Sequence, residues 1–458
     1  MSDATTSSSR GDQVVTQLGV GADRYRDLPV DRYWVSTLPT WLRFRTHGQD
    51  ATGVAHLFPG GGQDEWISGV VDGHGTGGEL WARESLMSLV HWSVVHWTGL
   101  KRLLRRRQVE QARQLIQSGF RETEQRIIHR IGPKAYHGGS TASLTLVIIV
   151  RRRRYLIQAA VGDSPAGIAV DGVATPTVTE ANGDNQQAVE EFHHRHQAAG
   201  VTTPAVIYSR IGTSHSPLQV EWPEGSGEYN TIPAWVYQGD QVRPNVEGYE
   251  AIRRQTGYYH GQQSRNYPPV YYREQDQAWV VRPGHEADNW GNSCVKGYGQ
   301  NLTGFGDLMS GLASDCDASV HIREEPRACL AYACSDGIGD LLPIGEMAQQ
   351  IQRLHRSGYR GYRLVQAWQD WIRTQINFTH EPQYAWTPEG YAYHDDCSWV
   401  SLDLPAWEPP ARRHRHRQTR RRHIQWHLGQ AARLIDTLER QDGSVPRIQV
   451  PRSIQDHC

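Results

Sequence analysis

The chain has 458 residues, enough for one large domain or two ordinary ones, and 38% of them are hydrophobic, so a sizeable core can form. Its formal net charge of −1 excludes a global attraction to nucleic acid or to anionic membranes. Residues 1–20 contain no apolar signal segment, and no apolar run is long enough to span a bilayer. We therefore expect an intracellular protein of the cytoplasm or nucleus that makes no membrane contact.

Composition divides the chain into an N-terminal extension, one large domain and a tail. We expect residues 1–38, which begin with a small and polar stretch, to be partly disordered. Residues 39–404 carry the strand and helix patterns of one domain. Within it, residues 205–300 are rich in Tyr, Trp, Gly and Pro and lose all periodicity, which indicates a large insertion. Residues 405–458 are rich in Arg and His.

Two short apolar stretches, Gly53–Phe58 and Trp66–Val71, predict neighbouring strands joined by a Pro-Gly-Gly-Gly turn. Asp50 precedes the first strand and Asp72 follows the second. Carboxylates on adjacent strands can converge on one metal centre. An open peptide oxygen at Gly73 would add a hard ligand, which Mg²⁺ and Mn²⁺ prefer. The alternative is a turn whose Asp only bonds its own backbone.

Helices and strands alternate after this turn. We predict helices over Gly77–Trp97 and Lys101–His129, followed by strands over Ala142–Val150 and Arg154–Val161. The arginine run at 105–107 is assigned to a solvated helix face, with a nucleic-acid patch as the alternative. A further strand is predicted at Cys329–Cys334, a helical region at Ile344–Ile376, and a last strand at Ser398–Leu404.

The insertion and the tail have no chemistry of their own. The insertion is either a separately packed lobe or a wall of aromatic anchors that selects protein substrates. The run of Arg and His at 412–423 predicts a segment for electrostatic docking or localisation. Nucleic acid is not an expected partner except through a contact of this tail.

Five acidic residues lie at the ends of predicted strands. In chain order they stand in the motifs Gln49-Asp50, Asp72-Gly73-His74-Gly75, Gly162-Asp163-Ser164, Ser335-Asp336-Gly337-Ile338 and Asp395-Asp396-Cys397-Ser398. This order resembles the metal-dependent Ser/Thr protein phosphatases of the PP2C (PPM) family over residues 40–404. The resemblance implies an α/β (α+β) fold, a four-layer α-β-β-α sandwich of two antiparallel sheets flanked by helices, with the large insertion in the flap region.

The same resemblance implies roles for single residues. Asp72 would bridge two Mn²⁺ or Mg²⁺ ions, and Gly73 would give its carbonyl to one of them. The other metal ligands would be Asp336, Asp395 and Asp50, with Asp163 helping to hold a third ion. Arg45 would grip the phosphate bidentately, and His74 would protonate the leaving oxygen. The implied activity is hydrolysis of phosphoserine and phosphothreonine in proteins.

Several positions depart from the family pattern. Gln49 stands where Glu is common, Pro165 where Arg follows Gly-Asp-Ser, and Thr303 where Arg precedes Phe-Gly-Asp. Thr76 is inserted after the His-Gly pair, and Gly339 replaces a Trp. The five acids are retained, so these changes affect substrate binding and flap geometry first. The alternative function is a catalytically weak or inactive scaffold that binds partner proteins.

Overall fold

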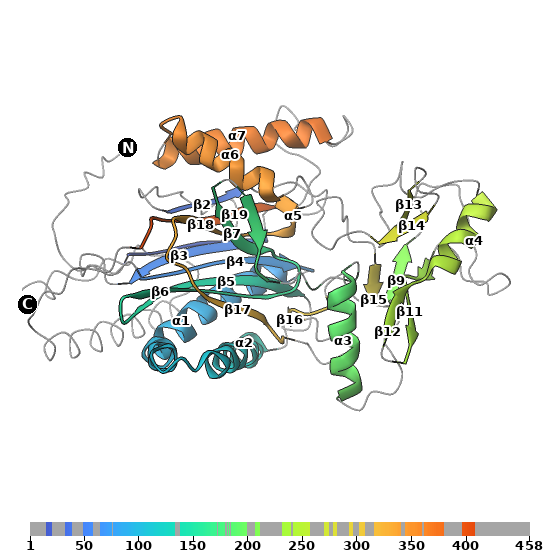
Figure 1. Cartoon of the computed structure of the whole chain (residues 1–458), viewed down its shortest axis with the longest axis horizontal. Helices are drawn as coiled ribbons and strands as arrows, with labels where there is room; N and C mark the ends of the chain where they lie inside the picture. The colour runs from blue at the N-terminus through green and yellow to red at the C-terminus, as the bar shows by residue number, and fades with distance from the viewer. Residues whose placement is uncertain are drawn as a thin grey trace, which may run out of the picture.

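The structure is a computed structural model, and its description covers the greater part of the chain. The residues it describes are 15–20, 33–38, 49–57, 65–75, 77–132, 138–171, 173–178, 181, 183, 185–198, 207–210, 231–239, 241–256, 270–273, 278–281, 293–295, 302–306, 316–339, 344–359, 361–379 and 396–407. Two antiparallel sheets form its centre, and helices cover both outer faces (Figure 1).

The larger sheet has the strand order β1-β3-β4-β5-β6-β17, with β16 paired to the start of β5. Its strands are β1 (Val15–Val20), β3 (Ala51–Leu57), β4 (Glu65–His74), β5 (Gly139–Val150), β6 (Arg153–Val161), β16 (Phe305–Gly306) and β17 (Ser319–Glu324). All twelve residues of β5 are buried. Its near-continuous apolar sequence follows from this burial, since helices cover one face of the sheet and the second sheet covers the other.

The smaller sheet has the order β2-β19-β18-β7-β8. Its strands are β2 (Tyr33–Leu38), β7 (Ala166–Val170), β8 (Val173–Pro176), β18 (Cys329–Cys334) and β19 (Cys397–Leu404). The side chains of Val54, Val70 and Leu156 meet those of Ile168 and Val400 between the two sheets. This contact makes the inner core of the sandwich.

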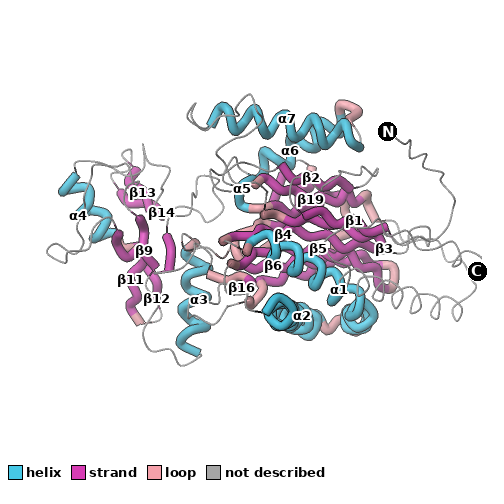
Figure 2. Tube along the Cα trace, turned by 180° about the vertical axis from the view of Figure 1, so that it is seen from behind, coloured by secondary structure: helices cyan, strands magenta, loops and turns pink. Residues whose placement is uncertain are grey.

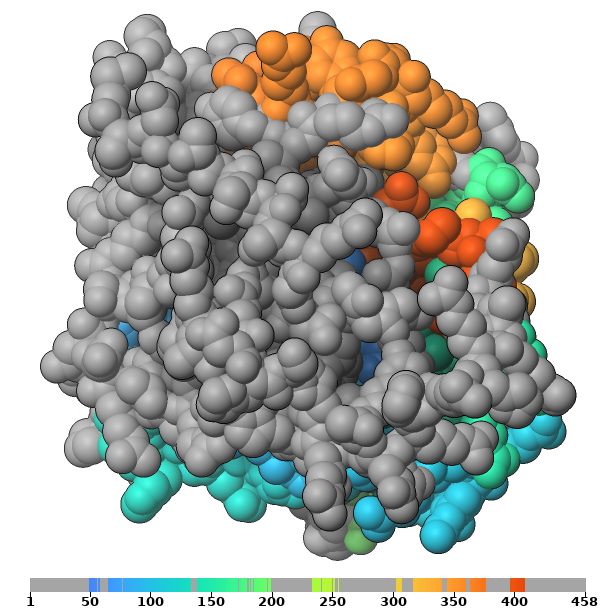
Figure 3. Space-filling view, turned by 90° about the vertical axis from the view of Figure 1, so that its left-hand side faces the viewer, coloured from blue at the N-terminus to red at the C-terminus, as the bar shows by residue number. Residues whose placement is uncertain are grey.

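Two helix pairs complete the layers. The larger sheet is covered by α1 (Gly78–Arg105) and α2 (Val109–Ile131), and the smaller by α6 (Ile344–Arg356) and α7 (Gly361–Thr379). Seen from the end opposite the insertion, α6 and α7 lie at the top in orange and α1 and α2 at the bottom in blue and turquoise (Figure 3). The four-layer α-β-β-α sandwich predicted from the sequence is therefore confirmed.

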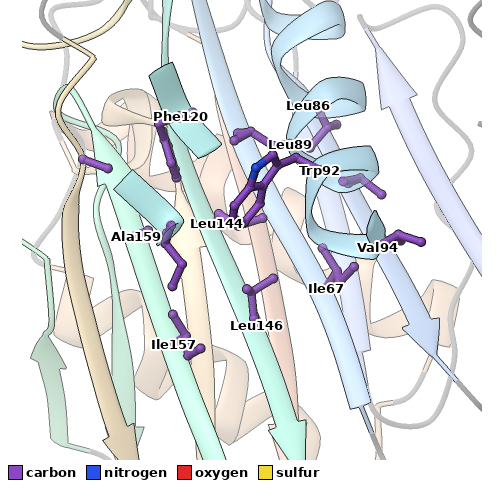
Figure 4. Close-up of a cluster of buried hydrophobic side chains, with 14 of the residues drawn as sticks. Ile67, Leu86, Leu89, Trp92, Val94, Phe120, Leu144, Leu146, Ile157 and Ala159 are labelled. Atoms are coloured by element: carbon purple, nitrogen blue, oxygen red, sulfur yellow. The ribbon is translucent and has the colours of Figure 1, made fainter. Parts of the chain in front are cut away.

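Packing between α1 and the larger sheet depends on aromatic and aliphatic side chains of several elements. Figure 4 shows Trp92 of α1 lying among Ile67, Leu144 and Phe120, which come from β4, β5 and α2. A Cβ atom on Gly119 of α2 would stand 2.3 Å from the indole of Trp92, so only glycine lets the two helices approach this closely.

The insertion packs as a lobe of its own beside one end of the sandwich (Figures 1 and 2). Its elements are β9 (Ile207–Arg210), β10 (Thr231–Pro233), β11 (Trp235–Gln238), β12 (Gln241–Pro244), α4 (Val246–Thr256), β13 (Val270–Arg273), β14 (Ala278–Val281) and β15 (Ser293–Val295). The helix α3 (Gln186–Ala198) precedes the insertion and packs against it. Trp235, Val189 and Phe192 make a small core, and burial raises the pKa of Tyr237 beside it to about 12. Trp235 and Tyr237 thus pack against α3.

The structure corrects two expectations. Residues 15–20 and 33–38, placed in the N-terminal extension by sequence, supply β1 and β2, which pair with β3 and β19. The first outer helix continues to Arg105, so Lys101 belongs to α1 and not to the second helix. The helical region predicted from Ile344 is present and consists of α6 and α7, which are separated near Gly358, whose φ is +87°.

Cys316, Cys329, Cys334 and Cys397 are buried and form no disulfide bond with any described residue. Burial raises the pKa of the Cys329 thiol to about 11, which keeps it protonated and unreactive.

Candidate functional site

Asp50 directly precedes β3, as the sequence predicts, whereas Asp72 lies inside β4, two residues before its end at His74. Ala51 pairs with Val71 across the antiparallel ladder, so Asp50 and Asp72 stand opposite one another at the next step. Asp72 in turn faces Thr141 of β5. Both carboxylates are buried, with relative exposures of 1% and 9%. Burial of two acids side by side is costly unless a cation or donor groups compensate it.

The turn after Asp72 is packed too tightly for any residue but glycine. A Cβ atom on Gly73 would lie 2.2 Å from the carbonyl oxygen of Gly78 and 2.7 Å from that of Gln49. Gly75 has a φ of +74°, in the left-handed region that glycine favours. The start of α1 is thereby pressed against the Asp72 turn, which fixes the direction of the Gly73 peptide.

Gln49 links this turn to the smaller sheet. Its backbone N–H donates to Oδ2 of Asp396 over 2.6 Å, and its side-chain Nε2 donates to the carbonyl of Gly75 over 2.7 Å. Its Oε1 is buried and accepts no hydrogen bond from any described residue. The first acid-bearing strand, the Asp72 turn and the start of β19 are therefore held together by one residue.

Ser335 makes comparable hydrogen bonds inside the smaller sheet. Its hydroxyl donates to the carbonyl of Asp396 over 3.0 Å and accepts the N–H of Ser398 over 2.9 Å. Asp336 follows immediately and begins α5 (Asp336–Gly339), a single short turn of helix. The ends of β18 and β19 that carry acids are thus fastened to each other.

Asp163 lies on the turn after β6, where the insertion joins the sandwich. Gly162, with a φ of +78°, donates its N–H to the Thr303 hydroxyl over 2.8 Å, and its carbonyl accepts the N–H of Ala181. Leu302 donates its N–H to the carbonyl of Ala181 over 2.8 Å. Thr303, a departure from the family pattern, therefore ties the exit of the insertion to the turn that carries Asp163.

His74 is the last residue of β4 and is half-buried. It pairs in register with Gly139, at the edge where β16 also meets β5. This position brings an imidazole to the same end of the sheet as Asp50 and Asp72.

Two predicted site residues, Arg45 and Asp395, lie outside the described residues, and their roles stay predictions. Within the described residues, no three His, Cys, Asp or Glu side chains form a ready-made metal cluster. Sequence reasoning did not identify Ser335, Asp396 or the two hydrogen bonds that Gln49 donates. The position of Asp396 beside Asp395 and that of Ser335 beside Asp336 were the only signals for the first two.

The described residues fit a divalent cation. Asp50 and Asp72 offer adjacent buried carboxylates, Asp336 offers a carboxylate at the end of β18, and the buried Gln49 Oε1 atom accepts no hydrogen bond from any described residue. Oxygen donors of this kind suit Mg²⁺ or Mn²⁺ better than softer metals.

We expect Ser335→Ala to loosen the acid-bearing strand ends. Loss of its two side-chain hydrogen bonds removes the tie to the Asp396 carbonyl and leaves the backbone bond from the Ser335 N–H to the Ser398 carbonyl, and such outer contacts typically change metal affinity by about 10–100-fold. Isothermal titration with Mn²⁺ measures the effect. Ser401→Ala is the control, since the Ser401 hydroxyl bonds Trp399 within β19. Equal Mn²⁺ affinity in both variants would contradict the fastening role.

We expect Gln49→Glu to have opposite effects on metal-free and metal-loaded protein. Glu cannot donate to Gly75, and it brings another carboxylate near Asp396, so the free energy of unfolding in EDTA should fall by about 2 kcal/mol. Mn²⁺ should bind more tightly, because the added charge attracts the cation. Urea unfolding with and without Mn²⁺ measures both. Adding Asp396→Asn should recover the part of the lost stability that comes from the second carboxylate, but not the part lost with the Gly75 hydrogen bond; no recovery would mean that the introduced carboxylate does not interact with Asp396.

Comparisons with known proteins identified solved structures of similar fold but no close relative. No family model and no curated protein matches the chain. Similar solved structures include a serine-threonine phosphatase 2C from Toxoplasma gondii, with 12% identity, a TM-score of 0.47, and coverage of 82% of this chain and 98% of that one.

Two bacterial structures are similar at the same level. The phosphatase Stp1 from Staphylococcus aureus has 11% identity and a TM-score of 0.38, and the match covers 84% of this chain and 99% of that one. The catalytic domain of the phosphatase PstP in complex with two manganese ions has 11% identity and a TM-score of 0.36, with coverage of 85% and 100%. No helix among the described residues is long and apolar enough to cross a membrane.

Proposed function

We propose that this protein is a Mn²⁺- or Mg²⁺-dependent phosphatase that hydrolyses phosphoserine and phosphothreonine in proteins. The observation that carries the proposal is the pairing of buried Asp50 with buried Asp72 at the edge where Gln49 joins the two sheets.

The residues would divide the work as follows. Asp72 and the Gly73 carbonyl would hold one ion, Asp72, Asp336 and Asp395 the other, with Asp50 beside them and Asp163 at a third, weaker site. Bound Mn²⁺ or Mg²⁺ lowers the pKa of water and neutralises charge on a phosphate. Arg45 would orient the phosphate through its planar guanidinium. His74, at the end of β4, would donate a proton to the departing serine or threonine oxygen.

The test is a Mn²⁺ titration of the full chain against p-nitrophenyl phosphate and a phosphothreonine peptide. We expect turnover that rises with Mn²⁺, stops in EDTA and returns when Mn²⁺ is restored. Turnover that survives EDTA would overturn the metal-dependent mechanism. Mn²⁺ binding without turnover of either substrate would favour the alternative, a phosphatase-like scaffold that binds partner proteins.

A further inference from the structure

Arginines gather at the end of the sandwich farthest from the candidate site. Arg102, Arg105, Arg106 and Arg107 are exposed at the end of α1, and Arg151 and Arg152 are exposed in the turn between β5 and β6. We call these six residues the arginine surface. Arg102, Arg105, Arg106, Arg107 and Arg151 form no ion pair with any described residue.

The buried carboxylate of Glu65 shows that the two segments lie together. It accepts a hydrogen bond from Nζ of Lys101 over 2.7 Å, and Lys101 is the residue before Arg102. It also accepts the backbone N–H of Ile149 over 2.7 Å, two residues before Arg151. Glu65 is fully buried, so this connection is rigid, and it holds the helix end and the hairpin at one end of the sheet.

Three members of the arginine surface occupy backbone positions that favour glycine. Arg107 has a φ of +60°, Arg151 of +50° and Arg152 of +69°. Asp171 is the remaining non-glycine residue with positive φ in the described part of the chain. A left-handed backbone costs energy for any residue with a Cβ atom. The sequence therefore keeps arginine here at the expense of stability, and strain of this kind often marks a functional site.

Local structure does not explain why arginine occupies these three positions. Arg107 follows a helix end where Gln108 N–H bonds the Leu103 carbonyl and Arg107 N–H bonds the Leu104 carbonyl, an arrangement that normally carries glycine at this residue. Arg151 and Arg152 are the two central residues of a hairpin turn with positive φ at both, where Asn-Gly is preferred. The helix dipole favours cations near the end of α1, but it does not require one in the left-handed position.

We propose that the arginine surface binds the phosphate backbone of a nucleic acid without sequence preference. Guanidinium groups hold phosphates bidentately. The exposed large apolar residues of the described chain, Val95, Val173, Val236, Val246 and Tyr359, all lie outside it. A protein partner would call for an apolar centre and a membrane for apolar anchors, whereas nucleic-acid interfaces are polar and positively charged. This inference does not depend on the proposed hydrolysis.

The experiment measures fluorescence anisotropy of labelled single-stranded RNA and duplex DNA, each in two sequences, with the full chain across a salt series. The test variant combines Arg107→Gly, Arg151→Asn and Arg152→Gly. We expect it to bind at least about tenfold more weakly near 0.1 M salt, with the slope of log affinity against log salt reduced by about 3. Its Tm should rise by roughly 2–4 °C, because the left-handed strain is relieved.

The control variant Arg353→Ala, Arg356→Ala, Arg363→Ala removes three exposed arginines from α6 and α7, and its binding should match wild type. Arg105→Gln with Arg106→Gln leaves the strained positions unchanged, and it should also weaken binding. Equal loss in the control variant, no binding by wild type, or a raised Tm with unchanged binding would each overturn the proposal. Binding of wild type to phosphatidylserine vesicles but not to nucleic acid would overturn it in favour of a membrane.

Discussion

Asp72→Asn should reduce Mn²⁺-dependent turnover of p-nitrophenyl phosphate by at least about 10³-fold. Asp72 is buried opposite Asp50, and as the proposed bridge between two ions it contributes a charge that both ions share. Asparagine has nearly the same shape but no charge, so the variant should fold and bind Mn²⁺ far more weakly. Steady-state kinetics and isothermal titration measure the two effects.

The matched control is Asp403→Asn, which neutralises an acid on β19 away from the candidate site. It should keep wild-type turnover and Mn²⁺ affinity. Circular dichroism and Tm in EDTA show whether Asp72→Asn retains the fold. A folded Asp72→Asn protein with wild-type turnover would remove the bridging role of Asp72, and the two-ion assignment with it.

Local sequence patterns predict the parts of the site that lie on one hairpin. The apolar runs on either side of the Pro-Gly-Gly-Gly turn place Asp50 and Asp72 at the same end, and the register of β3 and β4 confirms that arrangement. The Asp-Gly pair predicts the tight turn, and the close packing at Gly73 gives its physical reason. The apolar pattern and the turn residues are sufficient to predict this part of the site, because every contact in it joins residues that are close in sequence.

Contacts between distant segments were not predictable in the same way. The bond from Gln49 to Asp396 joins residues 347 positions apart, and nothing in either local sequence indicates it. The end of α1 was misplaced because sequence rules look for glycine at a helix end, and this chain has Arg107 there instead. β1 and β2 were missed because their apolar alternation is weak without the strands that pair with them.

His74→Gln should slow a phosphothreonine peptide by about 10²–10⁴-fold, the usual contribution of a general acid. The threonine oxygen of the peptide is a poor leaving group as an alkoxide, so it needs a proton. p-Nitrophenyl phosphate releases a stable phenolate without help, so the same variant should slow it much less. The ratio of the two kcat values therefore separates proton donation from metal binding.

His96→Gln provides the control, since His96 is a half-buried residue of α1 whose ring nitrogen contacts the Trp92 carbonyl. It should leave both substrates unaffected. Mn²⁺ affinity should stay at the wild-type value in His74→Gln, because His74 is not assigned as a ligand. The bare rate loss could arise from a distorted turn, but distortion would slow both substrates alike and weaken Mn²⁺ binding. Equal slowing of the two substrates would therefore assign His74 to the structure of the Asp72 turn and leave the proton donor to another group.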